Sequence, residues 1–329
     1  KKKKNNKKKK KMNEALNGKK VLIFGGSGFI GSHLVKNLCT HSCQIEVLSR
    51  KLNYKSSLFL GNEPGQIKYK HIKDFKQESI DNLVSGSDVV INLIGILYEK
   101  KKSTFEFIHS IVPMMIAKAC KKNKVRYFLH MSALNVDKVK DSNYALSKMK
   151  GETLAKEHFK DITIIRPGVV FGKGDNFTNF FYNLSKISPI LPLIGTPEIL
   201  KKNKFIPKID FKKRVKFQPI YVVDLVNFII SKCLSKSNIF ELAGPVICSF
   251  DEIFDIILNS KKKKRFYFPV PFFMATIIAF VLERMPTPLL TRDQIKLLRK
   301  DSTSNQGLQN LKKEIKNPTS IESVIDTYI

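Results

Sequence analysis

Tyr144 and Lys148 are the two ends of the pentapeptide Tyr-Ala-Leu-Ser-Lys, inside a segment, residues 143–159, that predicts a helix. Side chains at positions i and i+4 of a helix share one face, so the phenol and the ammonium are expected side by side. A nearby ammonium disfavours the protonated phenol and lowers its pKa from about 10 toward neutrality, which makes the phenol usable as a proton donor or acceptor. Ser132, at the end of a predicted strand, adds a hydroxyl for a substrate carbonyl. Ser132, Tyr144 and Lys148 are therefore the candidate catalytic residues, either working or vestigial.

A glycine-rich turn, Gly-Gly-Ser-Gly-Phe-Ile-Gly over residues 25–31, joins a predicted strand at 21–24 to a predicted helix at 32–39. Such a turn lets the backbone approach a pyrophosphate, whose charge is met by amide N–H groups at the helix N-terminus. Because strand, glycines and helix coincide, the sequence predicts a dinucleotide site. The predicted contacts are Gly25, Ser27, Gly28, Phe29, Ile30 and Gly31.

The second predicted strand, residues 45–48, is followed by Ser49, Arg50 and Lys51. This position lies about 20 residues past the glycines, where an NAD site usually places a carboxylate on the ribose 2′-hydroxyl. Arg50 would instead pair with a ribose 2′-phosphate through charge-assisted hydrogen bonds, so the sequence favours NADP(H) over NAD(H). NAD(H) stays open as an alternative, because Arg50 is also compatible with an ordinary solvated arginine of a basic chain.

Apolar runs alternate with helix-length segments along the first half of the chain. Strands are predicted at residues 21–24, 45–48, 67–72, 88–94, 125–131 and 162–165. Continuous apolar strands joined by helical crossovers are typical of a parallel sheet that is buried on both faces. The predicted fold class is therefore α/β, a Rossmann doubly wound parallel sheet with a smaller, mostly helical C-terminal lobe.

The same patterns divide the chain into four parts. Residues 1–18 are predicted as a lysine-rich disordered tail, and residues 19–172 and 217–245 as the NAD(P)-binding Rossmann domain. Residues 173–216 are predicted as a lysine-rich loop or insertion. Residues 246–329 form the predicted helical lobe, with helices at 250–258, 272–282 and 291–300, and this lobe would dock on a membrane or a partner.

The charge of the chain is strongly positive. Its 329 residues include 59 lysines and arginines against 28 acidic residues, a formal net charge of +31, while 43% are hydrophobic. That hydrophobic fraction excludes a wholly disordered chain, and the charge favours anionic partners such as phosphate ligands and acidic lipid headgroups. Nucleic acid is not expected as a partner, because the basic residues are not interleaved with aromatic residues in any reader pattern.

Cysteines and histidines are scattered through the sequence. The five cysteines form no CxxC pair, which favours reduced thiols in a compartment that is not oxidising. The six histidines show no metal-ligand spacing, so they are interpreted as surface or packing residues and no metal site is predicted.

Residues 266–282 are the most apolar segment, although prolines interrupt it near its start and it is too short to predict a membrane-spanning helix. A lysine-rich run precedes it at 261–265 and Glu283 and Arg284 follow it. One interpretation is a buried core helix. The other is a helix that lies on a membrane surface or in a partner's groove, because interfacial docking uses a basic cluster beside an apolar face.

Taken together, the glycine turn, Ser132, the Tyr-Lys pair and the segments Arg-Pro-Gly-Val-Val-Phe-Gly at 166–172 and Gln-Pro-Ile-Tyr-Val-Val-Asp at 218–224 resemble the extended and atypical short-chain dehydrogenase/reductases. The resemblance implies that Tyr144 is the acid/base, Lys148 holds the nicotinamide ribose and Ser132 orients the substrate carbonyl. It also implies further cofactor contacts at Leu93, Ile94, Gly95, Pro167 and Val169.

A narrower resemblance covers nearly the whole chain. Residues 92–97, 130–134, 188–195, 217–222 and, most specifically, Pro-Leu-Leu-Thr-Arg-Asp-Gln-Ile-Lys-Leu-Leu at 288–298 are similar to the nucleotide-binding accessory subunit of respiratory complex I and its bacterial homologues. This resemblance implies an NADPH held as a structural ligand with no established turnover. It implies other complex I subunits and an anionic membrane surface as partners. The implied location is peripheral on the inner membrane, at the cytoplasmic face in a bacterium or the matrix face in a mitochondrion.

Two functions therefore remain as hypotheses: an NADP(H)-binding accessory subunit of complex I, or an NADP(H)-dependent reductase, epimerase or dehydratase that uses Tyr144 and Lys148. Independent catalysis is not the favoured prediction. The gap between Ser132 and Tyr144 is short for an active extended enzyme, so Ser132 is expected to be displaced from a working triad. Residues 196–216 interrupt the resemblance as an insertion, on the side where an enzyme would build its substrate loops.

Overall fold

The protein is described from a computed structural model that covers residues 15–50, 63–101, 103–196, 198–200, 208–210 and 214–329. Seven parallel strands form the central sheet, in the order β13-β6-β5-β4-β1-β2-β3. The strands are β1 (Lys20–Phe24), β2 (Gln44–Ser49), β3 (Ile67–His71), β4 (Val89–Asn92), β5 (Tyr127–Met131), β6 (Thr163–Pro167) and β13 (Asn238–Leu242). The strand order reverses between β1 and β4, and at such a reversal a doubly wound sheet has its ligand crevice, outside the carboxyl ends of the strands. The predicted Rossmann class is confirmed.

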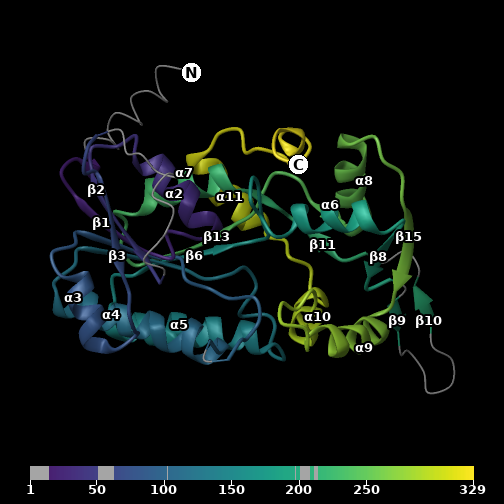
Figure 1. Cartoon of the computed structure of the whole chain (residues 1–329), viewed down its shortest axis with the longest axis horizontal. Helices are drawn as coiled ribbons and strands as arrows, with labels where there is room; N and C mark the ends of the chain where they lie inside the picture. Colours follow the sequence, from purple (N-terminus) through teal and green to yellow (C-terminus); the bar gives the residue numbers. More distant parts are fainter. Residues whose placement is uncertain (1–14, 51–62, 102, 197, 201–207, 211–213) are drawn as a thin grey trace.

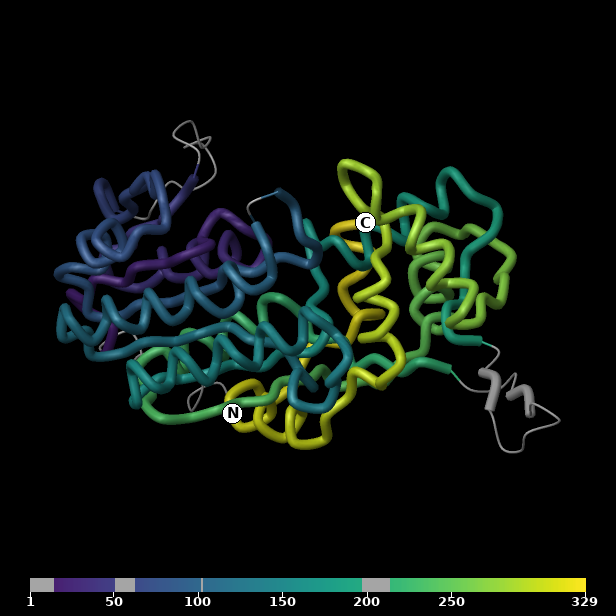
Figure 2. The backbone as a smooth tube through the Cα atoms, turned by 90° about the horizontal axis from the view of Figure 1, so that it is seen from below, coloured from purple at the N-terminus to yellow at the C-terminus, as the bar shows by residue number. Residues whose placement is uncertain are grey.

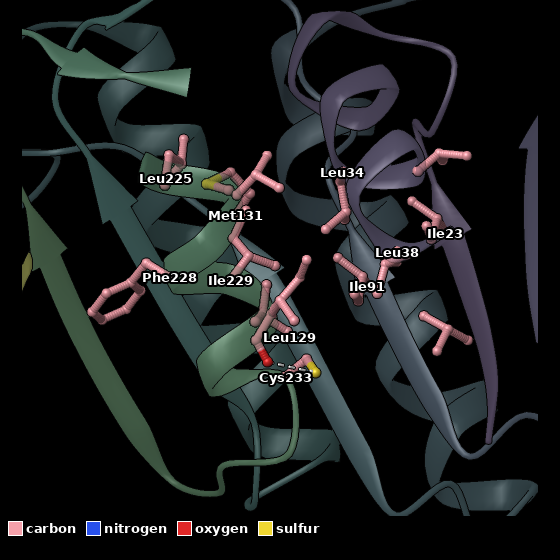
Figure 3. Close-up of a cluster of buried hydrophobic side chains, with 14 of the residues drawn as sticks. Ile23, Leu34, Leu38, Ile91, Leu129, Met131, Leu225, Phe228, Ile229 and Cys233 are labelled. Atoms are coloured by element: carbon pink, nitrogen blue, oxygen red, sulfur yellow. Dashed lines mark hydrogen bonds between the residues drawn. The ribbon is translucent and has the colours of Figure 1, made fainter. Parts of the chain in front are cut away.

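Helices cover both faces of this sheet (Figure 1). One face carries α2 (Phe29–Leu38), α7 (Val222–Lys232) and α11 (Asn305–Glu314), and the other carries α3 (Gln77–Val84), α4 (Val112–Lys122) and α5 (Asn143–His158). Figure 3 shows Leu34 and Leu38 of α2 next to Ile91 of the sheet, with Phe228 of α7 further along in the same buried cluster. All four are at most 1% exposed. Full burial of one such side chain contributes about 1.5–3 kcal/mol to stability, so the packed sheet holds the loops at its edge in place.

The smaller lobe lies at one end of the molecule, where Figure 2 shows the later part of the chain in green and yellow. Its main elements are α6 (Thr178–Ile187), β8 (Ile190–Ile194), α8 (Phe250–Ser260), β15 (Phe266–Val270), α9 (Phe272–Leu282) and α10 (Arg292–Leu298). Phe181, Phe250 and Phe254 form its centre with edge-to-face and tilted ring contacts, the closest having centroids 4.8 Å apart. An aromatic core of its own makes the lobe a distinct packing unit.

The remaining elements are short. Their bounds are β7 (Val170–Phe171), β9 (Glu198–Leu200), β10 (Lys208–Asp210), β11 (Lys216–Phe217), β12 (Ile220–Tyr221), β14 (Cys248–Ser249), the π-helix η2 (Glu106–Ile111) and the 3-10 helix η3 (Ile325–Thr327). Strand β7 pairs with β12 and β11 pairs with β14, so the chain crosses between sheet and lobe through two small ladders.

Three features differ from the sequence-based division of the chain. Residues 15–18 were assigned to a disordered tail, but Leu16 is fully buried in the main core and the amide of Gly18 donates to the carbonyl of Ser42 at 2.8 Å. The rest of the predicted tail, residues 1–14, lies outside the described residues. Burial of Leu16 and the Gly18 hydrogen bond both favour an ordered segment here, and the lysine-rich neighbours conceal this leucine in the sequence.

Residues 173–216, predicted as a loop or insertion, contain helix α6 and strand β8. Strand β8 pairs in parallel with β15, more than 70 residues later in the chain, from Ile190 opposite Phe266 to Ile194 opposite Val270. Likewise α11, from the segment assigned to the C-terminal lobe, packs back against β13 and α7, and its Leu311 is fully buried in the main core. Both arrangements depend on distant partners, which local periodicity does not reveal.

Candidate functional site

The glycine turn lies between β1 and the start of α2, and its glycines are required by close contacts. Gly25 has φ +79°, a left-handed conformation that favours glycine. A Cβ on Gly31 would lie 2.2 Å from the carbonyl oxygen of Gly25 and 2.6 Å from the Cα of Gly26. The N-cap residue of α2 is Gly28, which supplies no capping side chain. The helix N-terminus therefore presents backbone amides to the crevice, an arrangement that suits a phosphate.

The loop after β4 packs directly against this turn. A Cβ on Gly25 would lie 3.1 Å from the carbonyl carbon of Leu93. The buried side chain of Asn92 fixes the loop, because its Oδ1 accepts from the amide of Ile94 at 3.1 Å while its Nδ2 donates to Nδ1 of His130 at 3.1 Å. Leu93, Ile94 and Gly95, predicted as cofactor contacts, thus lie beside the glycine turn at the carboxyl edge of the sheet.

Lys148 is buried, and its ammonium points at the end of β5. Its Nζ donates to the carbonyl of Met131 at 3.2 Å, and Gly95 leaves room for it, since a Cβ there would lie 3.3 Å from Nζ. Burial lowers the pKa of Lys148 to about 8, while Glu152, one helical turn further on, opposes that shift. Next to Met131, the hydroxyl of Ser132 is buried and has no hydrogen-bond partner among the described residues. Buried polar groups in proteins normally have hydrogen-bond partners, so the unpartnered hydroxyl next to this buried lysine is a candidate ligand contact.

Tyr144 reaches the same region from the first turn of α5, but its environment differs from the expected one. Its ring lies edge-on to Phe105 and to His109, with centroids 5.8 and 5.1 Å away. Burial raises the pKa of Tyr144 to about 12. The predicted downward shift is therefore wrong: Lys148 directs its ammonium at a backbone carbonyl, and desolvation of the phenol dominates. The phenol keeps its proton at neutral pH.

His109 is a member of this site that the sequence did not reveal. Its Nε2 accepts from the amide of Ile96 at 3.0 Å, and its Nδ1 donates to the hydroxyl of Ser147 at 3.0 Å, which itself donates to the carbonyl of Tyr144. Burial, and then the charge of Lys148, lower its pKa to about 2, so the ring is neutral. His109 thereby joins the loop after β4 to helix α5. Its sequence neighbours give no signal of this, because its partners lie 13 and 38 residues away.

An ion-pair cluster, centred on the buried pair Arg166–Glu152, holds the other side of α5. Arg166, at the end of β6, makes a two-point contact with Glu152 at 2.9 and 2.6 Å and also donates to Asp137 at 3.1 Å. This cluster places Pro167 and Val169 one strand beyond Ser132, whose own amide donates to the carbonyl of Ile165.

Arg50 lies one residue past the end of β2 and is exposed. The glycine turn overlies the same strand, since a Cβ on Gly26 would lie 2.8 Å from Cγ1 of Val47. Arg50 is thus on the edge of the sheet where the ribose next to adenine would be expected. Its neighbour Lys51 lies outside the described residues.

All the predicted cofactor contacts therefore gather along the carboxyl ends of β1, β2, β4, β5 and β6. Turn amides for a diphosphate, an edge arginine, a buried lysine and an unpartnered hydroxyl fit a nicotinamide dinucleotide. Among the described residues, no group of three or more histidine, cysteine or acidic side chains is placed to hold a metal ion.

A second surface stands out on the smaller lobe. Helix α9 buries only Ala275 and Ala279, whereas Phe273, Ile277 and Val281 are 55%, 62% and 63% exposed. The helix thus turns small residues inward and large apolar residues outward. None of the helices in the described part of the chain is both long and apolar enough to cross a membrane.

Comparison with known proteins bears directly on this site. Residues 21–230, which contain the glycine turn, Ser132 and the Tyr-Lys pair, match the model of the NAD dependent epimerase/dehydratase family. The chain belongs to this family. Membership supports a nicotinamide dinucleotide as the ligand of the crevice.

Relatives that match most of the chain narrow the assignment. The chain is 30% identical to NADH dehydrogenase [ubiquinone] 1 alpha subcomplex subunit 9, mitochondrial, of Dictyostelium discoideum, over 88% of this chain and 78% of that protein. It is 28% identical to the NADH-ubiquinone oxidoreductase 40 kDa subunit, mitochondrial, of Neurospora crassa, over 85% and 71%. The resemblance to subunits of respiratory complex I is confirmed.

A solved structure shows the same fold in a more distant protein. The Citrobacter sp. triphenylmethane reductase complexed with NADP(H) superposes with a TM-score of 0.70 at 14% identity, covering 94% of this chain and 100% of that chain. The likeness of fold thus extends over both the sheet and the smaller lobe.

Proposed function

We propose that this protein is an accessory subunit of respiratory complex I that holds NADP(H) as a structural ligand. The observation that carries this proposal is the contrast within one site: the groups that would hold a dinucleotide are in place, whereas Tyr144, the expected acid/base, lies among aromatic rings with its pKa raised to about 12. The match to complex I subunits along most of the chain supports the same role.

Each part of the nucleotide has a group to receive it. The amides at the start of α2 would take the diphosphate, Arg50 the ribose 2′-phosphate, and Lys148 the hydroxyls of the nicotinamide ribose. The unpartnered hydroxyl of Ser132 would hydrogen-bond the carboxamide of the nicotinamide ring. When bound, such a nucleotide supplies a hydride donor or acceptor. For this chain its main contribution is to stability, because a ligand at about 100 times its Kd adds about 2.7 kcal/mol to the folded state.

Helix α9 provides the attachment. Its outward apolar side chains resemble those of a helix that rests in an interface, and the guanidinium groups of Arg284 and Arg292 lie over the ring of Phe280 in the same helix. Basic residues next to an apolar face attract anionic lipid, and the apolar side chains then leave water. We place the protein peripherally on the inner membrane, against complex I and its anionic lipids. The mitochondrial relatives favour the matrix face over the cytoplasmic face of a bacterium.

A second candidate function is an NADP(H)-dependent reductase, epimerase or dehydratase. Lys148 directs its ammonium at the end of β5, where Ser132 follows, and a phenol that keeps its proton is able to donate a hydrogen bond to a carbonyl. This arrangement favours carbonyl binding over proton transfer, so we rank the enzyme second.

Nucleotide titrations of an arginine variant test the proposed ligand. Arg50→Glu should weaken NADPH far more than NADH, because it places a repelling charge where the 2′-phosphate would lie. Arg126→Glu is the matched control, since Arg126 is also exposed but precedes β5 at the opposite edge of the sheet. Equal loss of both nucleotides in Arg50→Glu would refute the NADP(H) preference, and a wild-type chain that binds neither would refute the nucleotide-holding role itself.

A further inference from the structure

The helix that carries Tyr144 and Lys148 is held at its N-terminus by a residue from the smaller lobe. Asp293, in the first turn of α10, accepts from the amide of Asn143 through Oδ1 at 2.7 Å. Its Oδ2 accepts from the amide of Tyr144 at 3.0 Å and from the hydroxyl of Ser142 at 2.8 Å. One carboxylate from 150 residues away thus engages the first two backbone amides of α5 and its N-cap side chain.

The contact requires an acceptor that is negatively charged. The N-terminus of a 16-residue helix carries a partial positive charge, and its first amides have no acceptor inside the helix. A carboxylate meets both needs at once, through hydrogen bonds that the negative charge strengthens. An amide of the same shape would keep one acceptor oxygen, lose the charge, and turn an NH₂ group toward the helix amides.

Helix α10 is also seated on the segment between Ser132 and Tyr144. Leu297 packs against Ala145, Val136 and Val139, and the side chain of Asn135 donates to the carbonyl of Asp301 at 2.9 Å. The C-terminal segment therefore fixes the start of α5 and the loop that follows Ser132 together.

The opposite side of α10 is bound to the exposed helix α9. Ile295 is fully buried with Ala275 and Ala279, the two small residues on the inner side of α9. Arg292 and Glu283 add an ion pair at 2.7 Å between the start of α10 and the end of α9. A continuous chain of packed and charged contacts thus runs from α9 through α10 to the helix of the candidate nucleotide site.

We propose that Asp293 is a positioning residue that couples the two ends of the protein, so that docking through α9 and binding of the nucleotide strengthen each other. The inference rests on the proposed nucleotide-holding function. Asp293 sets where α5 begins, and Lys148 lies on the second turn of that helix, so any displacement of α10 moves the lysine that would hold the ribose. Linkage requires the reverse effect: bound nucleotide steadies α10 and, through it, α9.

Nucleotide titration of the full chain tests the positioning role. Asp293→Asn should bind NADPH about tenfold more weakly than wild type, within the range typical of coupled sites. The matched control is Ser249→Ala, which removes the N-cap side chain of α8, another helix of the same lobe. Because no hydrogen bond or ion pair joins the described residues of α8 to those of α5, Ser249→Ala should stay within about twofold of wild type. An Asp293→Asn variant that binds as wild type does, or a control that loses as much, would overturn the proposal.

Hydrogen exchange on the wild-type chain provides a second test that no folding defect affects. NADPH should slow amide exchange in the glycine turn and, as the distinctive result, in residues 292–298 of α10, while α8 changes little. Protection confined to the glycine turn would overturn the coupling and leave the nucleotide-holding function intact. A wild-type chain with no NADPH binding in either experiment would refute both.

Discussion

Helices α7 and α9 have the same length, 11 residues, and both are rich in apolar residues, but α7 buries its large apolar side chains whereas α9 exposes most of them. Helix α7 buries Leu225, Phe228 and Ile229 against the sheet, whereas α9 buries two alanines and exposes Ile277, Val281 and their large neighbours. The first helix is part of the scaffold and finds all its partners within the chain. The outer face of the second helix stays largely exposed among the described residues, which is why it is the region we assign to docking.

Glutamate substitutions at matched isoleucines give the largest difference between the two helices. Ile229→Glu should cost 4 kcal/mol or more, roughly, in the free energy of unfolding, because it buries an unpaired carboxylate. Ile277→Glu should change it by less than about 0.5 kcal/mol, since that side chain already meets water. Urea unfolding measures both values. Ile277→Glu should nevertheless lose binding to vesicles of phosphatidylcholine and cardiolipin, and comparable destabilisation by the two variants would refute the comparison.

The glycine turn follows β1 of the central sheet, and its close contacts leave no room for an added methyl group. Gly31→Ala places a methyl group 2.2 Å from the carbonyl oxygen of Gly25, so the turn must open. We expect NADPH binding to weaken about 100-fold, about 2.7 kcal/mol, in a fluorescence titration. Gly86→Ala is the control, because Gly86 also has a positive φ, +70°, but lies before β4 at the far edge of the sheet. Equal losses of NADPH affinity in the two variants would indicate a general effect of backbone strain and would contradict a role of the glycine turn in binding the nucleotide.

Acid should lower the free energy of unfolding, because two histidines are buried in the larger, sheet-containing part of the protein. Burial lowers the pKa of His109 to about 2 and that of His130 to about 3, while both return to about 6.5 in the unfolded chain. Below about pH 6.5 the unfolded state takes up protons that the folded state does not, so their contribution to stability is complete above that pH and is lost as the pH falls. The loss approaches about 1.4 kcal/mol per pH unit for each histidine.

Urea midpoints measured between about pH 7 and about pH 4.5 test this pH dependence. His109→Gln and His130→Gln should each flatten the slope, whatever they do to the stability at neutral pH. A slope that both variants leave unchanged would show that other groups control the acid transition.

The smallest effect on nucleotide affinity is expected from a substitution of Tyr144, whose backbone amide donates to Asp293 of the smaller lobe. Tyr144→Phe removes a hydroxyl that the proposed structural role does not use, while the edge-on ring contacts with Phe105 and His109 remain available. NADPH affinity should stay within about twofold of wild type, by the same titration. Loss of a measurable carbonyl reduction in this variant would favour the enzyme instead.

Local sequence patterns predict the scaffold well and the contacts between its parts poorly. Helix α5 was expected at residues 143–159 and spans Asn143–His158, and α9 coincides with its predicted bounds, because each lies between clear boundary signals. The β8–β15 pair, the return of α11 to the sheet, and the partners of His109 and Asp293 join residues that are far apart in the sequence. The direction of the Tyr144 pKa was wrong for a related reason, since spacing reveals a nearby charge but not the desolvation that dominates it.

The most direct test of the account is gentle isolation of the protein from its native membranes, followed by identification of the proteins that accompany it and quantification of the nucleotide it releases. The account predicts other complex I subunits and close to one NADP(H) per chain. A protein recovered alone, without a tightly held nucleotide, would contradict the account and make Tyr144 a residue to study with carbonyl substrates.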